Sequence, residues 1–179
     1  YGWVQDRDEL IDLVSDRMLT AVDLPEVDSE TGWRCVLRAL ARALRRLGRA
    51  NPGYAAAALC RYRTGPGHLD LNRRVVVSLS SAGFDIAMAQ RAFETMVTVV
   101  LGWQAREEAC AMLGEAPRHI VDDLERTAME LDRPYSVEAA TAACAELRAA
   151  ADERFEFLIE TVLAGLPDPA PRKWTELDE

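Results

Sequence analysis

The chain of 179 residues lacks the patterns that identify several common classes of protein. It has no run of about 20 apolar residues, so we expect no segment that spans a membrane. The longest apolar stretch, 96–103, is interrupted by a threonine and a glycine. The first ten residues hold Asp6, Asp8 and Glu9, where a secretion signal would be basic and then apolar. The length suffices for one sizeable hydrophobic core.

Residues that bind metals or form disulfides are also few. Neither of the two histidines, His68 and His119, has a second histidine or a cysteine at the spacing of a helical metal site. The four cysteines are spread evenly, and no pair has metal or redox spacing: Cys35, Cys60, Cys110 and Cys144. We therefore expect no metal and no cofactor. We interpret the cysteines as reduced, small apolar residues, which is typical of a cytoplasmic protein.

Signatures of catalysis are equally scarce. The serines near 78–81 end a helical pattern, and no strand precedes them that could form a nucleophile elbow. The turn at 65–67 contains two glycines and a proline but lacks the lysine and the spacing of a phosphate-binding loop. No residue is therefore predicted to be catalytic, and the chain is not expected to be an enzyme.

The charge is unbalanced in two ways. The net charge is −9, which argues against binding of nucleic acid by this chain alone, because phosphate contacts need a basic surface. Twenty of the 21 basic residues are arginine, and five of them share one face of a predicted helix: Arg34, Arg38, Arg42, Arg45 and Arg49. Such a stripe could contact nucleic acid or acidic lipid. In an acidic chain we expect instead a solvated face that pairs with acids of neighbouring helices.

Helical periodicity dominates the rest of the chain, and strand signals are nearly absent. We predict an all-α fold, a single domain of about eight helices. Asp6 and Asp85 are expected to cap two of them, and Ser136 a third. The expected helices are 7–22, 32–49, 53–63, 68–81, 86–112, 119–132, one that follows Ser136, and 153–166.

A ligand site is predicted beside the middle of the long helix, near Trp103. Met96, Val100 and Trp103 follow at spacings of four and three, so they share a face, and Thr95 and Gln104 supply polar groups at its edge. Such a mixture suits a mostly apolar small molecule held by a few polar contacts. The alternative is that this face is simply core or subunit interface. Three further residues complete the predicted site: Phe93, and Tyr62 and His68 on the far wall.

The last predicted helix carries a second apolar stripe. Its residues are spaced for one face of a helix: Phe155, Leu158, Ile159 and Val162. A single domain of this size has little room to bury both this stripe and that of the long helix. Surplus apolar faces indicate subunit interfaces, so we expect a homodimer that associates through these four residues.

Two segments resemble a known family. Residues 1–14, YGWVQDRDELIDLV, resemble the joint between the recognition helix and the next helix in TetR-type transcription regulators. Residues 152–166, DERFEFLIETVLAGL, resemble the last helix of the same family. Residues 33–53 and the turn at Gly83-Phe84 also fit its pattern, so the resemblance extends over nearly the whole chain in order.

The resemblance implies a homodimer whose two C-terminal helices form a four-helix bundle with those of the partner. It also implies a small molecule in each core that shifts the helix 7–22, so that the two DNA-reading heads no longer match successive major grooves. Residues 1–5 would be the end of the recognition helix, 6–166 the ligand-binding and dimerisation domain, and 167–179 an extended tail. Operator DNA would be bound only through helices that precede residue 1.

The leading hypothesis is therefore a transcriptional repressor controlled by a small molecule. An alternative is a TetR-like helical protein without a DNA-binding head, which acts as an enzyme or sequesters a ligand. A plain helical scaffold is a third possibility, and it predicts no pocket.

Overall fold

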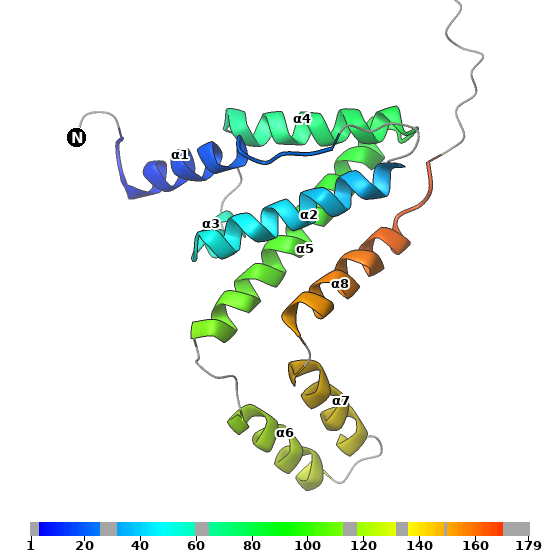
Figure 1. Cartoon of the computed structure of the whole chain (residues 1–179). Coiled ribbons are helices and arrows are strands. Elements are labelled where there is room, and N and C mark those ends of the chain that lie inside the picture. Colours follow the sequence, from blue (N-terminus) through cyan, green and yellow to red (C-terminus); the bar gives the residue numbers. More distant parts are fainter. Residues whose placement is uncertain are drawn as a thin grey trace, which may run out of the picture.

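The computed structural model describes residues 4–25, 32–59, 65–112, 118–131, 136–148 and 150–169. Within these ranges the chain forms α-helices and no strand, as the sequence predicts (Figure 1). The eight helices are α1 (Arg7–Leu19), α2 (Gly32–Ala50), α3 (Tyr54–Leu59), α4 (Pro66–Ser81), α5 (Ile86–Met112), α6 (Arg118–Leu131), α7 (Ser136–Arg148) and α8 (Ala151–Gly165).

Two of the expected caps are present. The side chain of Asp6 accepts a hydrogen bond of 2.8 Å from the backbone N–H of Glu9 at the start of α1, and Asp85 accepts one of 2.8 Å from Met88 at the start of α5. Each bond satisfies a backbone donor that the first turn of a helix leaves unpaired. Ser136 is instead the first residue of α7. Gly83, with φ of 105°, forms the turn between α4 and α5, a conformation that side chains rarely adopt.

The helix boundaries differ from the predicted ones by a few residues. α1 ends at Leu19 rather than at residue 22, although hydrogen-bonded turns continue to Val22. α7 and α8 are separated between Arg148 and Ala151, close to the expected break. Of α3 the described part is Tyr54–Leu59, and the rest of the expected helix 53–63 lies outside the described residues.

The hydrophobic core lies between α2, α4, α5 and α8. Its largest side chains have no or almost no exposed surface: Leu37, Leu40, Leu79, Phe93, Met96, Phe155 and Ile159. Burial of one such side chain contributes roughly 1.5–3 kcal/mol to the free energy of unfolding. The rings of Trp33 and Phe84 close the end of this core in an edge-to-face contact, with centroids 5.0 Å apart.

A row of ion pairs joins α2 to α8 and α5. Arg38 and Arg42 each donate two hydrogen bonds to one carboxylate of α8, Glu160 and Glu156 respectively. The remaining pairs are Arg34 with Asp168, and both Arg45 and Arg49 with Glu107 and Asp152. We call these five arginines and their carboxylates the arginine ladder. The prediction that the arginine stripe pairs with neighbouring acids is confirmed.

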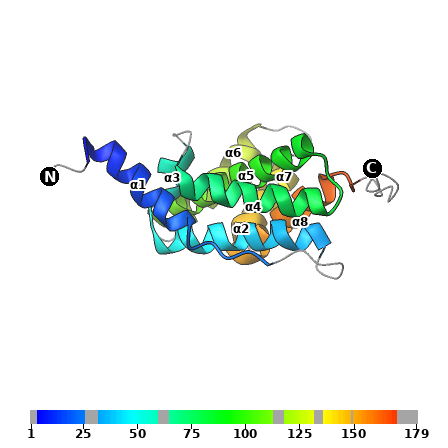
Figure 2. The ribbon, with the colours of Figure 1, turned by 90° about the horizontal axis from the view of Figure 1, so that it is seen from above.

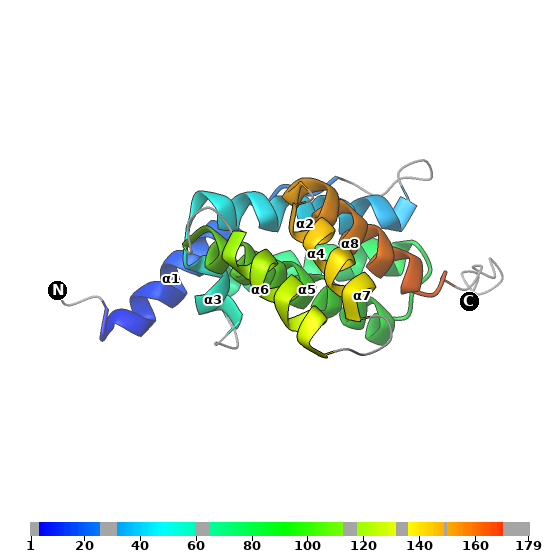
Figure 3. The same ribbon diagram turned by 90° about the horizontal axis from the view of Figure 1, so that it is seen from below.

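Two parts of the fold project from the core formed by α2, α4, α5 and α8. Figure 2 shows α1 extending beyond one end of the other helices, although its C-terminal half packs on α4. α6 and α7 pack on each other as a hairpin below α5 and α8 (Figures 1 and 3). No helix among the described residues is long and apolar enough to cross a membrane.

Candidate ligand-binding site

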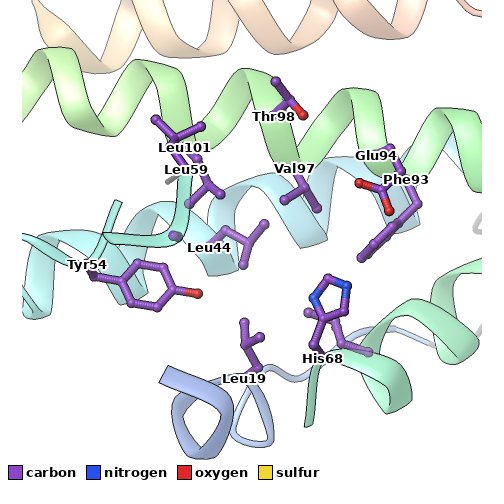
Figure 4. A pocket seen from close by; sticks show the side chains of 12 residues that line it. Leu19, Leu44, Tyr54, Leu59, His68, Phe93, Glu94, Val97, Thr98 and Leu101 are labelled. Carbon is purple, nitrogen blue, oxygen red and sulfur yellow. The ribbon is translucent and has the colours of Figure 1, made fainter. Parts of the chain in front are cut away.

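A cavity of about 240 Å³ lies where α1, α3 and α4 meet the middle of α2 and α5 (Figure 4). Most of its wall is aliphatic or aromatic: Leu19, Leu44, Ala58, Leu59, Leu71, Phe93, Val97 and Leu101. Four side chains bring polar atoms to it: Tyr54, His68, Glu94 and Thr98. This combination of an apolar wall and a few polar groups is the usual character of a small-molecule site.

Glu94 is the acidic group of the cavity, and two amides hold it in place. Gln90, one turn earlier on α5, donates a hydrogen bond of 3.0 Å from Nε2 to Oε1 of Glu94. Asn72 of α4 in turn donates one of 3.0 Å from Nδ2 to Oε1 of Gln90. Asn72 thus orients the amide of Gln90, and Gln90 donates to the carboxylate of Glu94.

His68 and Phe93 form the wall beside Glu94. Their rings meet edge to face, with centroids 5.9 Å apart. Figure 4 shows the imidazole pointing up into the cavity from α4, with the ring of Tyr54 at the opposite end. Leu44 and Val97 lie between these two ends.

The same corner of α4 is bonded to α1. The carboxylate of Asp16 accepts hydrogen bonds of 2.9 Å from the backbone N–H groups of Gly67 and His68, so it caps α4 from another helix. The helices approach so closely that a Cβ atom on Gly67 would overlap the backbone oxygen of Asp16. Leu19, one turn further along α1, is itself part of the cavity wall. The cavity thus contacts α1 directly through Leu19, and indirectly through the bonds of Asp16 to the first turn of α4.

Comparison with known proteins identifies the family to which this fold belongs. The family described as "Tetracyclin repressor-like, C-terminal domain" matches residues 24–168. The chain belongs to this family. The family, the all-α fold and the order of the helices agree with the expectation from the sequence. A search of curated proteins found no match.

Solved structures of TetR regulators have the same fold. ActR, a TetR family protein of Streptomyces coelicolor in complex with (S)-DNPA, is 28% identical, with a TM-score of 0.77, over 93% of this chain and 78% of that chain. ActR is also known in complex with actinorhodin. A possible TetR family transcriptional regulator from Streptomyces coelicolor A3(2) is 25% identical, with a TM-score of 0.70, over 89% and 77%. TetR of class A, with 5a,6-anhydrotetracycline and magnesium, is 18% identical over 93% and 78%, and its TM-score of 0.64 supports the fold alone.

The residues predicted for the ligand site are not all together in this TetR-like domain. His68 and Phe93 line the cavity. Met96 and Val100 lie in the core with no exposed surface, and Thr95 is exposed on α5. None of these last three is part of the cavity wall. Tyr62 lies outside the described residues.

Trp103 and Gln104 have different surroundings. The Trp103 ring faces α8, where its centroid is 6.1 Å from that of Phe155. Gln104 is 2% exposed and donates a hydrogen bond of 2.7 Å to the backbone oxygen of Leu44, which joins α5 to α2. Gln104 also lines a second, wider hollow of about 830 Å³ with Gly48, Ala105 and other residues of α2, α3 and α5. Some cavity residues that sequence reasoning missed, such as Leu19 and Tyr54, come from helices distant in sequence. Others, such as Glu94 and Val97, lie on α5 itself.

The residues predicted for the dimer interface divide into two pairs. Phe155 and Ile159 have no exposed surface within this chain, because they pack in its own core. Leu158 and Val162 are half-buried. The apolar side chain that α8 exposes most is Phe157, at 75%.

A metal centre is not evident in the part of the chain that the structure describes, where no three histidine, cysteine, aspartate or glutamate side chains form a group suited to an ion. Cys35, the one cysteine whose side chain is described, is a free thiol.

Proposed function

We propose that this chain is the ligand-sensing and dimerisation domain of a small-molecule-responsive transcriptional repressor. The observation that carries the proposal is the cavity beside α1, whose wall includes Leu19 of that helix and His68 of α4. From the resemblance to TetR-type regulators, we expect α1 to connect the core to a DNA-reading head. The complexes of ActR with (S)-DNPA and actinorhodin support a ligand-binding role for a domain that is 27–28% identical.

The contacts of α1 suggest how a ligand would act. A molecule that fills the cavity presses on Leu19 directly and on the first turn of α4, where Asp16 holds Gly67 and His68. Any ligand that fits better when α1 has moved will favour the moved position by its difference in affinity. The paired heads would then lose the spacing that two successive major grooves require.

The ligand contacts that we propose are His68 and Phe93 from the sequence prediction, together with Glu94. Tyr62, next to the described part of α3, remains a proposed wall residue. Trp103 and Gln104 are not proposed as contacts in this cavity, because they pack on α8 and α2.

We also propose that the protein is a homodimer in which the C-terminal helices of each subunit, α8 among them, form a four-helix bundle with those of the partner. Leu158 and Val162 retain part of their surface, and Phe157 beside them is exposed. Operator DNA would be bound by a head outside this chain, in the cytoplasm. Within α2 the ladder arginines already pair with carboxylates, which leaves them poorly suited to phosphate contacts.

The test of this function uses the product of the complete gene. DNA fragments that it retains are selected first, and hydrophobic natural products and antibiotics that raise the Tm of the chain are then tested for release of that DNA. Val97→Trp, which fills the cavity, is expected to abolish release while DNA binding persists. Val99→Trp, on the same helix but outside the cavity wall, should still respond.

Two results would contradict the proposal. A gene product that selects no DNA sequence is not a repressor. Release of DNA that Val97→Trp leaves unchanged would place the effector site elsewhere in the domain.

A further inference from the structure

We propose that the ligand of this cavity is an aromatic or otherwise apolar molecule that carries a protonated amine, and that the amine binds the carboxylate of Glu94. This inference rests on the proposed function, since it names the class of effector for the same site. It follows from the direction of the hydrogen bonds, from the charges in the wall and from the size of the cavity.

Two hydrogen bonds between described residues lead toward Glu94. Asn72 donates to Gln90, and Gln90 donates to Oε1 of Glu94. An ionised carboxylate only accepts hydrogen bonds and has about four acceptor positions on its two oxygens, so one amide donor leaves most of them for other partners. The two amides therefore orient Glu94 without neutralising its charge.

The charges in the wall favour a cation. None of the described residues that line the cavity is an arginine or a lysine. Five arginines, Arg38 and Arg42 among them, pair with carboxylates in the arginine ladder on the other side of α2. A ligand with its own carboxylate would meet Glu94 in a mostly apolar space, where like charges repel strongly. An ammonium group gains a charge-assisted hydrogen bond at the same position.

The size and shape of the cavity select the rest of the molecule. A cavity of about 150 Å³ holds one benzene molecule, and this one measures about 240 Å³. It therefore admits a substituted ring or a compact pair of fused rings. Figure 4 places Glu94 and His68 at one end of the cavity and Tyr54 at the other. A flat ring between Leu44 and Val97 would leave its amine beside Glu94.

The experiment compares three probes that share one ring system. They are naphthalen-1-ylmethylamine, naphthalen-1-ylmethanol and naphthalene-1-carboxylate, titrated calorimetrically into the chain at pH 7. We expect the amine to bind at least tenfold more tightly than the alcohol, since a hydrogen bond to a charged group contributes a factor of roughly ten to a hundred. The carboxylate should bind more weakly than the alcohol.

Three variants test whether Glu94 in this cavity causes the preference for the amine. Glu94→Gln keeps the shape of the side chain without its charge, so the amine should lose its advantage and the carboxylate should gain affinity. Glu138→Gln, an exposed glutamate on α7, should keep the preferences of the unmodified chain. Val97→Trp should remove binding of the alcohol and the amine alike.

The results that would contradict the amine proposal differ from those that would contradict the repressor function. Equal affinity for amine and alcohol, or a preference for the amine that survives in Glu94→Gln, would overturn the amine proposal. In that case Val97→Trp would still test whether the cavity is the effector site. Absence of amine binding at millimolar concentration would also overturn it, and release of operator DNA by another compound would then leave the repressor function standing.

Discussion

Two glycines show how a single Cβ atom can have opposite effects in this fold. Gly67 lies in the first turn of α4, directly under the backbone oxygen of Asp16, and it is buried. Gly102 lies in the middle of α5 and is exposed, with no atom within 4 Å of an added Cβ. The first glycine allows α1 to approach α4, whereas the second leaves α5 with a flexible residue and no contact in return.

Replacement of each glycine by alanine tests this difference. Gly67→Ala must push Asp16 and α1 away from α4, so we expect the free energy of unfolding to fall by about 1–3 kcal/mol, as for other overpacked sites. Gly102→Ala should raise it by about 0.5–1 kcal/mol, because alanine is the better helix former. Urea unfolding followed by circular dichroism measures both values. An unchanged stability of Gly67→Ala would mean that α1 is not held in this position.

The polar residues of α5 show why a single side chain is hard to interpret from sequence. Thr95, Glu94 and Gln104 are all polar positions on one helix, but Thr95 is exposed, Glu94 enters the cavity, and Gln104 is bonded to the backbone of α2. The spacing of residues shows which of them share a face. It does not show what lies opposite that face, and only the packing of other helices decides between ligand contact and structural hydrogen bond.

At the scale of helices, the arginine ladder aligns α2 against α8. The arginines follow at intervals of four and three, and Asp152, Glu156 and Glu160 follow at intervals of four on a helix that runs the opposite way. That the arginines pair with carboxylates was predictable from the sequence. The chain has more acidic than basic residues, and the arginines share a face of α2 other than its apolar one. The partner of each arginine was not predictable, since it depends on the register between the two helices.

The ion pairs of the arginine ladder should contribute unequally to the free energy of unfolding. The side chain of Arg45 is only 8% exposed, and Glu107 is its partner at 2.8 Å. Glu107→Ala should lower the free energy of unfolding by about 2 kcal/mol. That is less than the roughly 3–5 kcal/mol of a fully buried pair, because Asp152 remains beside Arg45. Glu160→Ala removes an exposed pair and should cost about 0.5 kcal/mol. Equal losses in chemical unfolding would contradict this ranking.

The ladder also makes stability depend on pH. Hydrogen bonds from Arg42 and Arg38 lower the pKa values of Glu156 and Glu160 below the ordinary 4.5. Burial alone would raise the pKa of Glu107, but the hydrogen bonds from Arg45 and Arg49 outweigh it, so this pKa is lowered too. The stability from these lowered pKa values is fully present above the unfolded pKa and is lost as the pH falls through the folded one.

Unfolding in urea should therefore give similar stability at pH 7 and about pH 5.5, and a steep loss below the ordinary glutamate pKa of 4.5. The double variant Glu156→Gln, Glu160→Gln should lose less stability over the acid range, because its two amides do not titrate. An acid loss as large as that of the unmodified chain would show that other carboxylates are responsible.

At the scale of the whole molecule, the fold was largely accessible from the sequence. Caps, turn glycines and apolar stripes mark all eight helices, and the observed ends differ from the expected ones by a few residues. The cavity was not accessible in the same way. α5 is apolar on more than one side, with Trp103 toward α8 and Val97 toward the cavity, and no local pattern tells which side leaves space. Leu19 and Tyr54, from α1 and α3, close that space through tertiary packing alone.

The apolar surface of α8 indicates how two subunits would associate. Phe155 and Ile159 complete the core of their own subunit, and Phe157 is the most exposed large apolar side chain of α8. A single exposed apolar side chain is common on protein surfaces, but Leu158 and Val162 near it on the same helix are also only half-buried, and a larger apolar surface of this kind indicates an interface. The expected four-helix bundle would cover Phe157, since α8 is one of the C-terminal helices that form it.

Phe157→Glu should make the protein monomeric. Phe157 has few contacts within its own subunit, so the variant should fold, whereas two glutamates at a bundle interface would be desolvated and repel each other. Val77→Glu is the matched control, because Val77 is also a large apolar residue, 53% exposed, and lies on α4, away from the C-terminal helices. Light scattering at micromolar concentration should give a dimer mass for the unmodified chain and Val77→Glu, and a monomer mass for Phe157→Glu. A monomer mass for the unmodified chain would refute the dimer itself. A dimer mass for Phe157→Glu, with circular dichroism that shows a folded protein, would move the interface to another face of the molecule.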